Sequence, residues 1–292
     1  MTHISMIDRV VGTYQESKKN FIIKGICIVG ALVIATLFLF PIYWLFITSL
    51  KSDAEILAKT LTYFPAVISF SAWGEQFKDA AFLDSLKNSA LIACSAMTIS
   101  LTIGIPAAYA MGRFDMPGKR VILLVFLVTQ MMPSSLLLTP LYLIFANTKL
   151  LNTYLAPAMA IASGSIPFTV ITLRPYFMSL PKSLDEAARI DGCNAFTSFL
   201  VVMVPTIKTG IITVLTIAFL HGWNDLVYSM TFNTNSTMRP LTANIYKFMD
   251  KYGMRWNCIM AYGLVLVIPV VCAFVFLQKY IVGGMTAGAV KE

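Results

Sequence analysis

The chain has 292 residues, of which 58% are hydrophobic and only 12% are charged. A soluble domain carries about twice that charged fraction, so this composition excludes a soluble globular protein and indicates a membrane protein. The formal net charge of +8 does not indicate nucleic-acid binding, because the basic residues lie at the ends of apolar runs and form no cluster interleaved with aromatic residues.

Five apolar runs each exceed the roughly 20 residues that a helix needs to cross the hydrocarbon layer. In chain order, they cover residues 25–50, 88–112, 121–148, 150–173 and 256–278. A sixth run, residues 209–224, is shorter and needs residues 226–230 or part of the preceding loop to complete a span. The predicted fold class is therefore all-α, a polytopic membrane protein with six transmembrane helices.

The segments between the runs indicate how the chain is oriented. Residues 1–20 form a polar arm, and the first apolar run is too long for the core of a cleavable signal peptide. Pro133 and Pro140 are expected to break the third span. Two longer polar loops, residues 51–87 and 228–255, face outward if the N-terminus is cytoplasmic. The basic residues then show a mild bias to the inside, so we expect both termini in the cytoplasm.

The loop between the fourth and fifth spans, residues 174–208, carries the clearest local pattern. Ser183 followed by Glu186 fits a capping box at a helix start. Gly192 stands where a left-handed C-terminal cap is needed, and Asn194 can cap a following helix. The pattern predicts a helix, a glycine turn and a second helix.

The same loop carries a family resemblance. Residues 186–192 read EAARIDG, and a Val-x-Val-Pro sequence follows at residues 202–205. This pattern resembles the EAA loop of the membrane subunits of ABC importers, in the form typical of the carbohydrate branch that includes the maltose permeases. Further similarity covers most of the chain after residue 88, with matches at residues 129–133, 140–142, 151–154, 223–225 and 280–291.

The resemblance implies that this loop is cytoplasmic and docks into a cleft on an ATPase subunit. The implied coupling residues are Glu186, Ala187, Ala188, Asp191 and Gly192. Glu186 would face a basic residue of the ATPase, although a capping role alone is the alternative. For Asp191 we favour a structural role, either bracing the turn at Gly192 or pairing with Arg189 or Lys182.

The resemblance also implies the partners of the chain. They are a second homologous permease subunit, two copies of a cytoplasmic ATPase subunit, an extracytoplasmic solute-binding protein, a sugar and membrane lipid, with no nucleic acid. ATP and Mg would bind in the ATPase subunit, so we expect no cofactor, metal or catalytic residue in this chain.

Polar residues inside the apolar runs are candidates for a sugar path. They are Gln130, Ser163, Ser165, Thr169 and Asn224. Serine and threonine in membrane helices more often bond to their own backbone or pack against a neighbour, so that alternative stays open. His221 has no second ligand for a metal. We expect Asp225 to be solvated at the outer interface, with Trp223 as its aromatic anchor.

Two more segments are expected to contact partners, as the resemblance implies. The second outer loop is expected to have a flexible polar tip that touches the binding protein. The residues of this tip are Asn233, Thr234, Asn235, Ser236 and Thr237. The C-terminal tail, residues 278–292, is expected to dock between the ATPases. Its contact residues would be Gly283, Gly284, Gly288 and Lys291. A frayed end is the alternative for the tail.

We therefore interpret residues 1–292 as a single transmembrane permease domain in the inner membrane of a bacterium. The expected function is ATP-driven, binding-protein-dependent import of sugars or oligosaccharides by alternating access. The alternative is a self-sufficient proton- or sodium-coupled carrier, which would need intramembrane carboxylates and internal repeats. Asp225 is the one candidate for such a carboxylate, it is expected at the interface, and no repeat is visible. A membrane scaffold would not need the EAA loop, and the sequence does not name the sugar.

Overall fold

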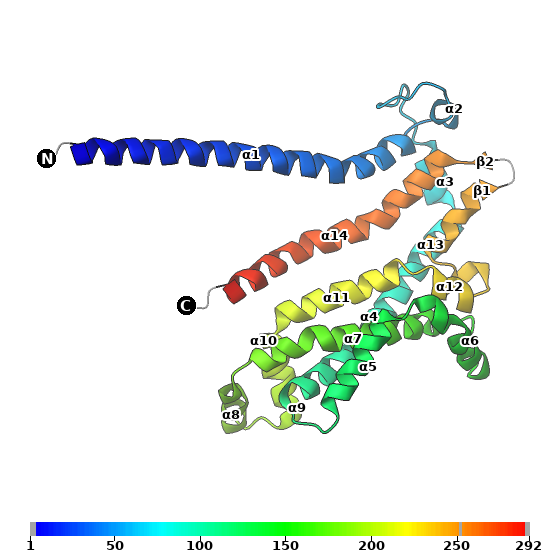
Figure 1. The fold of residues 1–292 in the computed structure, drawn as a ribbon. Coiled ribbons are helices and arrows are strands. Elements are labelled where there is room, and N and C mark those ends of the chain that lie inside the picture. The colour runs from blue at the N-terminus through cyan, green and yellow to red at the C-terminus, as the bar shows by residue number, and fades with distance from the viewer. Residues whose placement is uncertain (1–3, 251–252, 290–292) are drawn as a thin grey trace. The chain divides into compact units, whose positions relative to one another are not determined.

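The computed structural model describes residues 4–250 and 253–289, and these are largely helical (Figure 1). The chain divides into two compact units. The first comprises Met1–Ala72 and Arg255–Leu264, and the second comprises Trp73–Met254 and Val265–Glu292.

The first unit contains α1 (Ile4–Ser49), α2 (Asp53–Ile56) and the first turns of α14 (Trp256–Ala289). Aromatic residues gather at the C-terminal end of α1, where Phe40 and Trp44 stack and Tyr63 meets the Trp44 ring edge-on. The Tyr43 hydroxyl donates to the Tyr63 carbonyl at 2.7 Å. The Lys51 ammonium lies 5.1 Å from the Trp44 ring centroid, which allows a cation–π contact.

The second unit contains the remaining elements. Its longer helices are α3 (Ser71–Lys78), α4 (Ala80–Arg113), α5 (Lys119–Met131), α6 (Leu138–Asn147), α7 (Leu155–Ser179), α8 (Lys182–Ile190) and α11 (Lys208–Trp223). Its shorter elements are η1 (Ser134–Leu137), α9 (Ala195–Ser198), the π-helical turn η2 (Phe199–Met203), α10 (Val204–Thr206), α12 (Val227–Phe232), η3 (Ser236–Met238), α13 (Leu241–Asn244), η4 (Ile245–Phe248), and the antiparallel strands β1 (Met249–Asp250) and β2 (Gly253–Met254).

The predicted all-α membrane fold is confirmed. Four helical segments are long and apolar enough to cross a membrane, namely Ile23–Ser49, Ala80–Arg113, Leu155–Ser179 and Trp256–Gln278. Two further spans would each be a bent pair of helical segments: Lys119–Met131 with Ser134–Asn147, bent by 103°, and Ala195–Thr206 with Lys208–Trp223, bent by 83°. The six predicted runs thus correspond to four continuous helices and two bent pairs.

The breaks and ends of these helices differ in part from expectation. The third run breaks at Pro133, as predicted, because α5 ends at Met131. Pro140 does not break it, since this residue lies in the first turn of α6, where no intrahelical amide bond is lost. The backbone of the tail continues α14 to Ala289, and Lys291 lies outside the described residues.

Small residues let α4, α7 and α11 pack closely at the centre of the second unit. A Cβ atom on Gly104 of α4 would lie 2.7 Å from Cγ2 of Thr169 on α7. A Cβ atom on Gly222 of α11 would lie 2.5 Å from Cα of Ala93 on α4. Lipid tails are as apolar as the helices, so close packing of this kind is what holds membrane helices together.

Two apolar clusters extend this packing toward opposite ends of α4. One contains Ile92 and Ala96 of α4, together with Phe145 and Phe232. The other lies toward the C-terminal end of the helix. It contains Ala108 and Met111 of α4, together with Val170, Leu173, Phe177, Met203 and Val214. One continuous helix, which contains Pro106, therefore connects the surroundings of residues 228–255 with those of the loop that follows α7.

The contact between α11 and α4 can be tested by Gly222→Ala. The added methyl group would meet the backbone of Ala93, which cannot give way as a side chain can. We expect a loss of roughly 1–3 kcal/mol in stability, measured as a lower melting temperature of the purified protein. Gly30→Ala is the matched control, because a Cβ atom on this helical glycine meets nothing within 4 Å. Equal melting temperatures for the two variants would contradict the close packing.

Candidate functional site

The loop after α7 folds as a helix, a glycine turn and a second helix, as predicted. At the end of α8, the Cys193 amide donates to the Ala188 carbonyl at 2.9 Å, and the Gly192 amide donates to the Arg189 carbonyl at 3.1 Å. This is a Schellman motif, and Gly192 has the left-handed φ of +84° that the motif requires. The glycine cap predicted from the sequence is confirmed.

The helix after the turn also begins where the sequence indicates. Oδ1 of Asn194 accepts the Thr197 amide at 2.8 Å and so caps α9. The chain then continues through the π-helical turn η2 and the short helix α10 into α11. The bend in this span therefore lies between α10 and α11, directly after the loop.

The capping box expected at Ser183 and Glu186 is wrong. α8 begins at Lys182, with Pro181 before it and no side-chain cap. Pro181 is the N-cap residue, with an extended ψ of 145°, so the helical conformation begins at the next residue. Ser183 consequently lies inside the helix, and the Glu186 side chain is exposed on α8.

The coupling residues expected from the sequence lie mostly at the surface of this loop. Glu186, Ala187, Asp191 and Gly192 are exposed, whereas Ala188 is buried. Within the part of the chain that the structure describes, Asp191 forms no ion pair with Arg189 or Lys182. Its backbone amide donates to the Ala187 carbonyl at 2.9 Å, so the main chain braces the turn.

Two large apolar side chains of the loop also face outward. Ile190 is 87% exposed and Phe196 is 69% exposed. Neither residue was predicted as a contact residue, although apolar residues inside a charged loop are a usable signal in the sequence. Exposed apolar side chains beside a charged helix are available for contact with another surface.

A second feature missed from the sequence is the attachment of α8 to α4. At the end of α4, Nη1 of Arg113 donates to the Leu180 carbonyl at 2.7 Å, and Nη2 donates to the Pro181 carbonyl at 3.1 Å. The same guanidinium forms an ion pair with Asp185 of α8. The Arg113 side chain is only 8% exposed. The sequence carries no signal for this contact, because the paired residues lie 72 positions apart.

A cavity of about 490 Å³ lies between the end of α4 and α8. Tyr109 and Arg113 of α4 line it, together with Glu186 and Arg189 of α8. The Tyr109 ring also lies 4.9 Å, between centroids, from Phe199 of η2. The base of the loop is therefore packed onto α4 as well as hydrogen-bonded to it.

Another cavity, of about 510 Å³, lies between the ends of α5, α7 and α11. Two of the five sugar-path candidates, Gln130 and Asn224, line it along with Gly164, His221 and Asp225. Nε2 of Gln130 donates to the Gly164 carbonyl at 2.7 Å. Amide and imidazole groups that face a cavity can exchange hydrogen bonds with hydroxyl groups.

The other three sugar-path candidates do not line this cavity. The Ser163 hydroxyl donates to the Ala160 carbonyl at 2.7 Å, and the Thr169 hydroxyl donates to the Ser165 carbonyl at 2.9 Å. Ser165 is buried, and its hydroxyl lies 3.2 Å from Nδ1 of His221. Ser163 and Thr169 therefore bond to their own helix, as the alternative interpretation allows, whereas Ser165 supports a residue of the cavity.

The expectation for Asp225 and Trp223 is wrong. Trp223 is buried, and its Nε1 donates to the Leu266 carbonyl at 3.0 Å, so it is a packing residue rather than an interfacial anchor. The Asp225 carboxylate is not simply solvated. It caps α12 by accepting the Ser229 amide at 2.8 Å, the Ser229 hydroxyl at 2.6 Å and the Tyr228 amide at 3.3 Å.

The tip of the outer loop, expected to be flexible, is held by hydrogen bonds. Oδ1 of Asn152 accepts the Thr234 amide at 2.8 Å, the Thr234 hydroxyl at 3.0 Å and the Asn235 amide at 3.3 Å. Nδ2 of Asn88 on α4 donates to the Thr237 carbonyl at 2.8 Å. Asn233 is buried, whereas the residues from Thr234 to Thr237 are exposed. The loop thus presents polar side chains on a fixed backbone.

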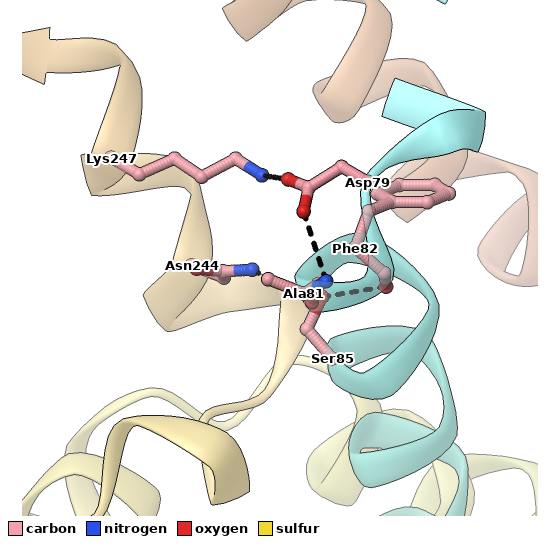
Figure 2. Close-up of polar contacts among 6 residues, drawn as sticks. All are labelled: Asp79, Ala81, Phe82, Ser85, Asn244 and Lys247. Atoms are coloured by element: carbon pink, nitrogen blue, oxygen red, sulfur yellow. Dashed lines mark hydrogen bonds and ion pairs between the residues drawn. The ribbon is translucent and has the colours of Figure 1, made fainter. Parts of the chain in front are cut away.

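The N-terminus of α4 contacts the same region, as Figure 2 shows. Asp79 caps α4 through the Ala81 amide at 2.9 Å and forms an ion pair with Lys247. Nδ2 of Asn244 donates to the Ala81 carbonyl at 3.0 Å. The hydrogen bond from Lys247, aided by the Ala81 amide, holds the pKa of Asp79 below its usual value.

Metal binding finds no support in the described side chains. Among these residues, no group of three or more His, Cys, Asp or Glu is placed to hold a metal ion.

Comparison with sequence families gives a match over residues 100–286 to the binding-protein-dependent transport system inner membrane component. The match covers well over half of the chain and includes α7, α8 and α11. The residues around the coupling loop and both cavities therefore lie largely inside it.

Individual proteins are similar over nearly the whole chain. The diacetylchitobiose uptake system permease protein DasC of Streptomyces coelicolor is 30% identical over 90% of this chain and 95% of its own length. The sulfoquinovosyl glycerol transport system permease protein SmoH of Agrobacterium fabrum is 30% identical over 92% and 94%. The trehalose/maltose transport system permease protein MalG of Thermococcus litoralis is 29% identical over 90% and 95%.

Solved structures share the fold. A chain of a bacterial ABC transporter involved in the import of the acidic polysaccharide alginate matches with a TM-score of 0.77 and 24% identity, over 90% of this chain and 97% of that chain. A chain of the bacterial alginate ABC transporter in complex with a pentasaccharide-bound periplasmic protein matches with a TM-score of 0.64 and 15% identity, over 91% and 95%.

The ion pair at the start of α4 predicts a pH dependence. The pKa of Asp79 is lowered in the folded state, so its contribution to stability is present above the usual value of 3.8 and is lost as the pH falls through the lowered pKa. At neutral pH, Lys247→Met should lower the free energy of unfolding by up to about 1 kcal/mol, as for other exposed pairs. The loss is measured as a lower melting temperature. The difference in melting temperature between Lys247→Met and the wild type should vanish in acid. Lys78→Met is the control, and a difference that persists below the lowered pKa would contradict the assignment.

Proposed function

Because this chain belongs to the family of binding-protein-dependent transport system inner membrane components, we propose that it is a permease subunit of an ATP-driven importer of sugars or oligosaccharides. Membership of this family makes it a multi-pass protein of the inner membrane. The observation that carries the proposal is the exposed helix α8, fixed to α4 and α7 at its base and closed by Gly192 at its tip.

The sugar class is supported by the relatives and by one cavity. The relatives are named for the transport of diacetylchitobiose, sulfoquinovosyl glycerol, and trehalose or maltose. The cavity lined by Gln130, His221 and Asn224 has a volume of about 510 Å³, within the range of small-molecule sites. Its amide and imidazole groups can exchange hydrogen bonds with sugar hydroxyls. We therefore propose that sugar passes this cavity.

The partner of the coupling loop would be a cytoplasmic ATPase. Ile190 and Phe196 offer apolar contacts at the surface of this loop, and Glu186 offers a carboxylate beside them. In this proposal, ATP and Mg bind to two copies of the ATPase, and this chain itself performs no hydrolysis. Six spans without an internal repeat supply half of a pathway, so a second, similar permease would supply the rest.

The outer loop would contact the solute-binding protein. The residues from Thr234 to Thr237 present hydroxyl and amide groups to solvent, while Asn88 and Asn152 fix their backbone. A surface that is already ordered loses less entropy on binding than a flexible one. With α8 in the cytoplasm and this loop outside, both termini are cytoplasmic. The proposed tail contact with the ATPases, through Gly283, Gly284, Gly288 and Lys291, remains a prediction.

The mechanism that follows is alternating access. When the two ATPases bind ATP and close, they would move α8. The helices bonded to α8 would move with it and open the cavity to one side of the membrane or the other. The solute-binding protein would deliver the sugar to the outward-open state. Hydrolysis would then separate the ATPases, open the cavity to the inside and so release the sugar there.

Changes in the coupling loop should separate transport from assembly in the membrane. Gly192→Pro replaces a φ of +84° with one near −65°, so the end of α8 cannot form its cap. Glu186→Ala removes the exposed carboxylate of α8. Each variant should lose a charge-assisted or backbone contact at the interface with the ATPase. We therefore expect ATP-dependent sugar uptake into membrane vesicles to fall about tenfold or more in both.

The control for this experiment is Gly118→Pro. Gly118 has a similar φ of +76° and precedes α5, outside the coupling loop. Membrane insertion should be normal in all three variants. Normal uptake in both Gly192→Pro and Glu186→Ala would contradict the assignment of α8 as the coupling helix.

The outer loop can be tested through Asn152, which holds its tip. Asn152→Gly removes the bonds to Thr234 and Asn235 but keeps the left-handed backbone at φ 58°. We expect the concentration of sugar-loaded binding protein needed for half-maximal ATPase stimulation to rise about fivefold. Lys149→Gly is the matched control, with φ 59°. An unchanged requirement in Asn152→Gly would remove the loop from the binding-protein contact.

A further inference from the structure

Three helix ends meet at Arg113, and the following inference rests on the proposed function. The residue closes α4, while Leu180 and Pro181 connect the end of α7 to the start of α8. This connection is only two residues long. Without other contacts, rotation of the backbone at Leu180 would let α8 swing relative to α7.

Arg113 removes that freedom by holding both sides of the connection. The carbonyls at the end of a helix have no intrahelical donor, and Arg113 supplies one to the Leu180 carbonyl at the end of α7. Its other terminal nitrogen donates to the Pro181 carbonyl at the start of α8, which also accepts the Leu184 amide at 3.3 Å. Its ion pair with Asp185 adds a bond to the first turn of α8. A planar guanidinium can serve several acceptors at once, which the single ammonium of a lysine does less well.

The position of Arg113 is itself fixed by the neighbouring backbone. A Cβ atom on Gly112 would lie 2.9 Å from Cβ of Phe177 and 3.3 Å from the Arg174 carbonyl oxygen, so α4 and α7 touch at this level. A reciprocal bond runs from Nε of Arg174 to the Met111 carbonyl at 3.3 Å. The arginine near the end of each helix thus bonds a carbonyl at the end of the other.

The opposite end of α4 carries the outer loop. Nδ2 of Asn88 donates to the carbonyls of Thr237 and Arg239, and the Ser89 hydroxyl accepts the Leu241 amide at 2.8 Å. Asp79 adds its ion pair with Lys247 (Figure 2). One continuous helix of 34 residues therefore has α8 fixed at one end and the segment proposed to meet the binding protein fixed at the other.

We propose that Arg113 is the positioning residue that joins α8 to α4, and that α4 acts as a rod between the ATPase contact and the binding-protein contact. When an ATPase displaces α8, α4 moves with it, and the outer loop moves with α4. The reverse also holds: when a sugar-loaded binding protein docks on the outer loop, α4 passes the displacement to α8. Coupling between the two sites is reciprocal by linkage.

The test uses the assembled complex of this chain with its second permease and ATPases. The probe is the cognate binding protein loaded with its sugar. We expect Arg113→Gln to leave ATP hydrolysis without binding protein near its wild-type rate. The stimulation of hydrolysis by the loaded binding protein should fall about tenfold, since charge-assisted hydrogen bonds in a buried site are lost. Both rates are expressed per assembled complex.

Three further variants identify the cause. Arg113→Lys keeps the charge but not the fork of donors, and should restore little of the stimulation. Asp185→Asn removes the ion pair and leaves the carbonyl bonds, so its loss should be intermediate. Arg120→Gln is the control, because this exposed arginine near the start of α5 makes the same change in charge away from the contact. A merely structural defect would lower both rates together.

Failure of this inference differs from failure of the proposed function. If the wild-type complex does not respond to the loaded binding protein, the proposed function is wrong. If the wild type responds and Arg113→Gln and Asp185→Asn respond equally well, only the role of Arg113 is overturned. If Arg113→Gln does not assemble, Asp185→Asn decides, because it retains the bonds to Leu180 and Pro181.

Discussion

The close contact between α4 and α7 is the constraint on which both functional regions depend. Gly104 and Gly112 allow the two helices to approach so closely that any side chain there would overlap with Thr169 or Phe177. In a membrane, dispersion contacts over such a surface replace the hydrophobic driving force of a soluble core. Because the helices touch along this length, the end of α7 is placed beside the end of α4, and the loop that follows α7 is placed with it.

This placement explains how a helix of nine residues can hold its place at the surface, as the proposed coupling role requires. An isolated helix of that length is unstable in water, since few bonds offset its nucleation. In this chain, the Schellman cap at Gly192 closes one end of α8, and the bonds from Arg113 hold the other. The anchored helix can leave Ile190 exposed for a partner without unfolding.

Features set by neighbouring residues could be predicted from the sequence. The apolar runs gave the spans, because crossing a membrane requires length and apolarity alone. Gly192 and Asn194 gave the turn of the coupling loop, because a left-handed cap and an N-cap depend on local chemistry. The capping box at Ser183 failed for an equally local reason: Pro181 starts the helix earlier than the serine pattern suggests.

Features that depend on packing could not be predicted. Asp185 looked like one more surface charge, and only the contact of α4 with α7 brings Arg113 to it. Asn152 looked like part of a short turn, yet it accepts three hydrogen bonds from a segment more than 80 positions away. Trp223 looked like an interfacial anchor, because aromatic residues are enriched at membrane interfaces on average. Its packing and hydrogen bond to α14 override that average.

The central claim is that ATP hydrolysis in partner subunits drives sugar through this chain. The most direct measurement is uptake into proteoliposomes that contain the complete complex, with ATP inside and the sugar-loaded binding protein outside. The compounds to supply are diacetylchitobiose, sulfoquinovosyl glycerol, trehalose and maltose, after the names of the relatives of this chain. The account predicts uptake that requires both ATP and the binding protein. Uptake driven by an imposed proton or sodium gradient, without ATP, would contradict it.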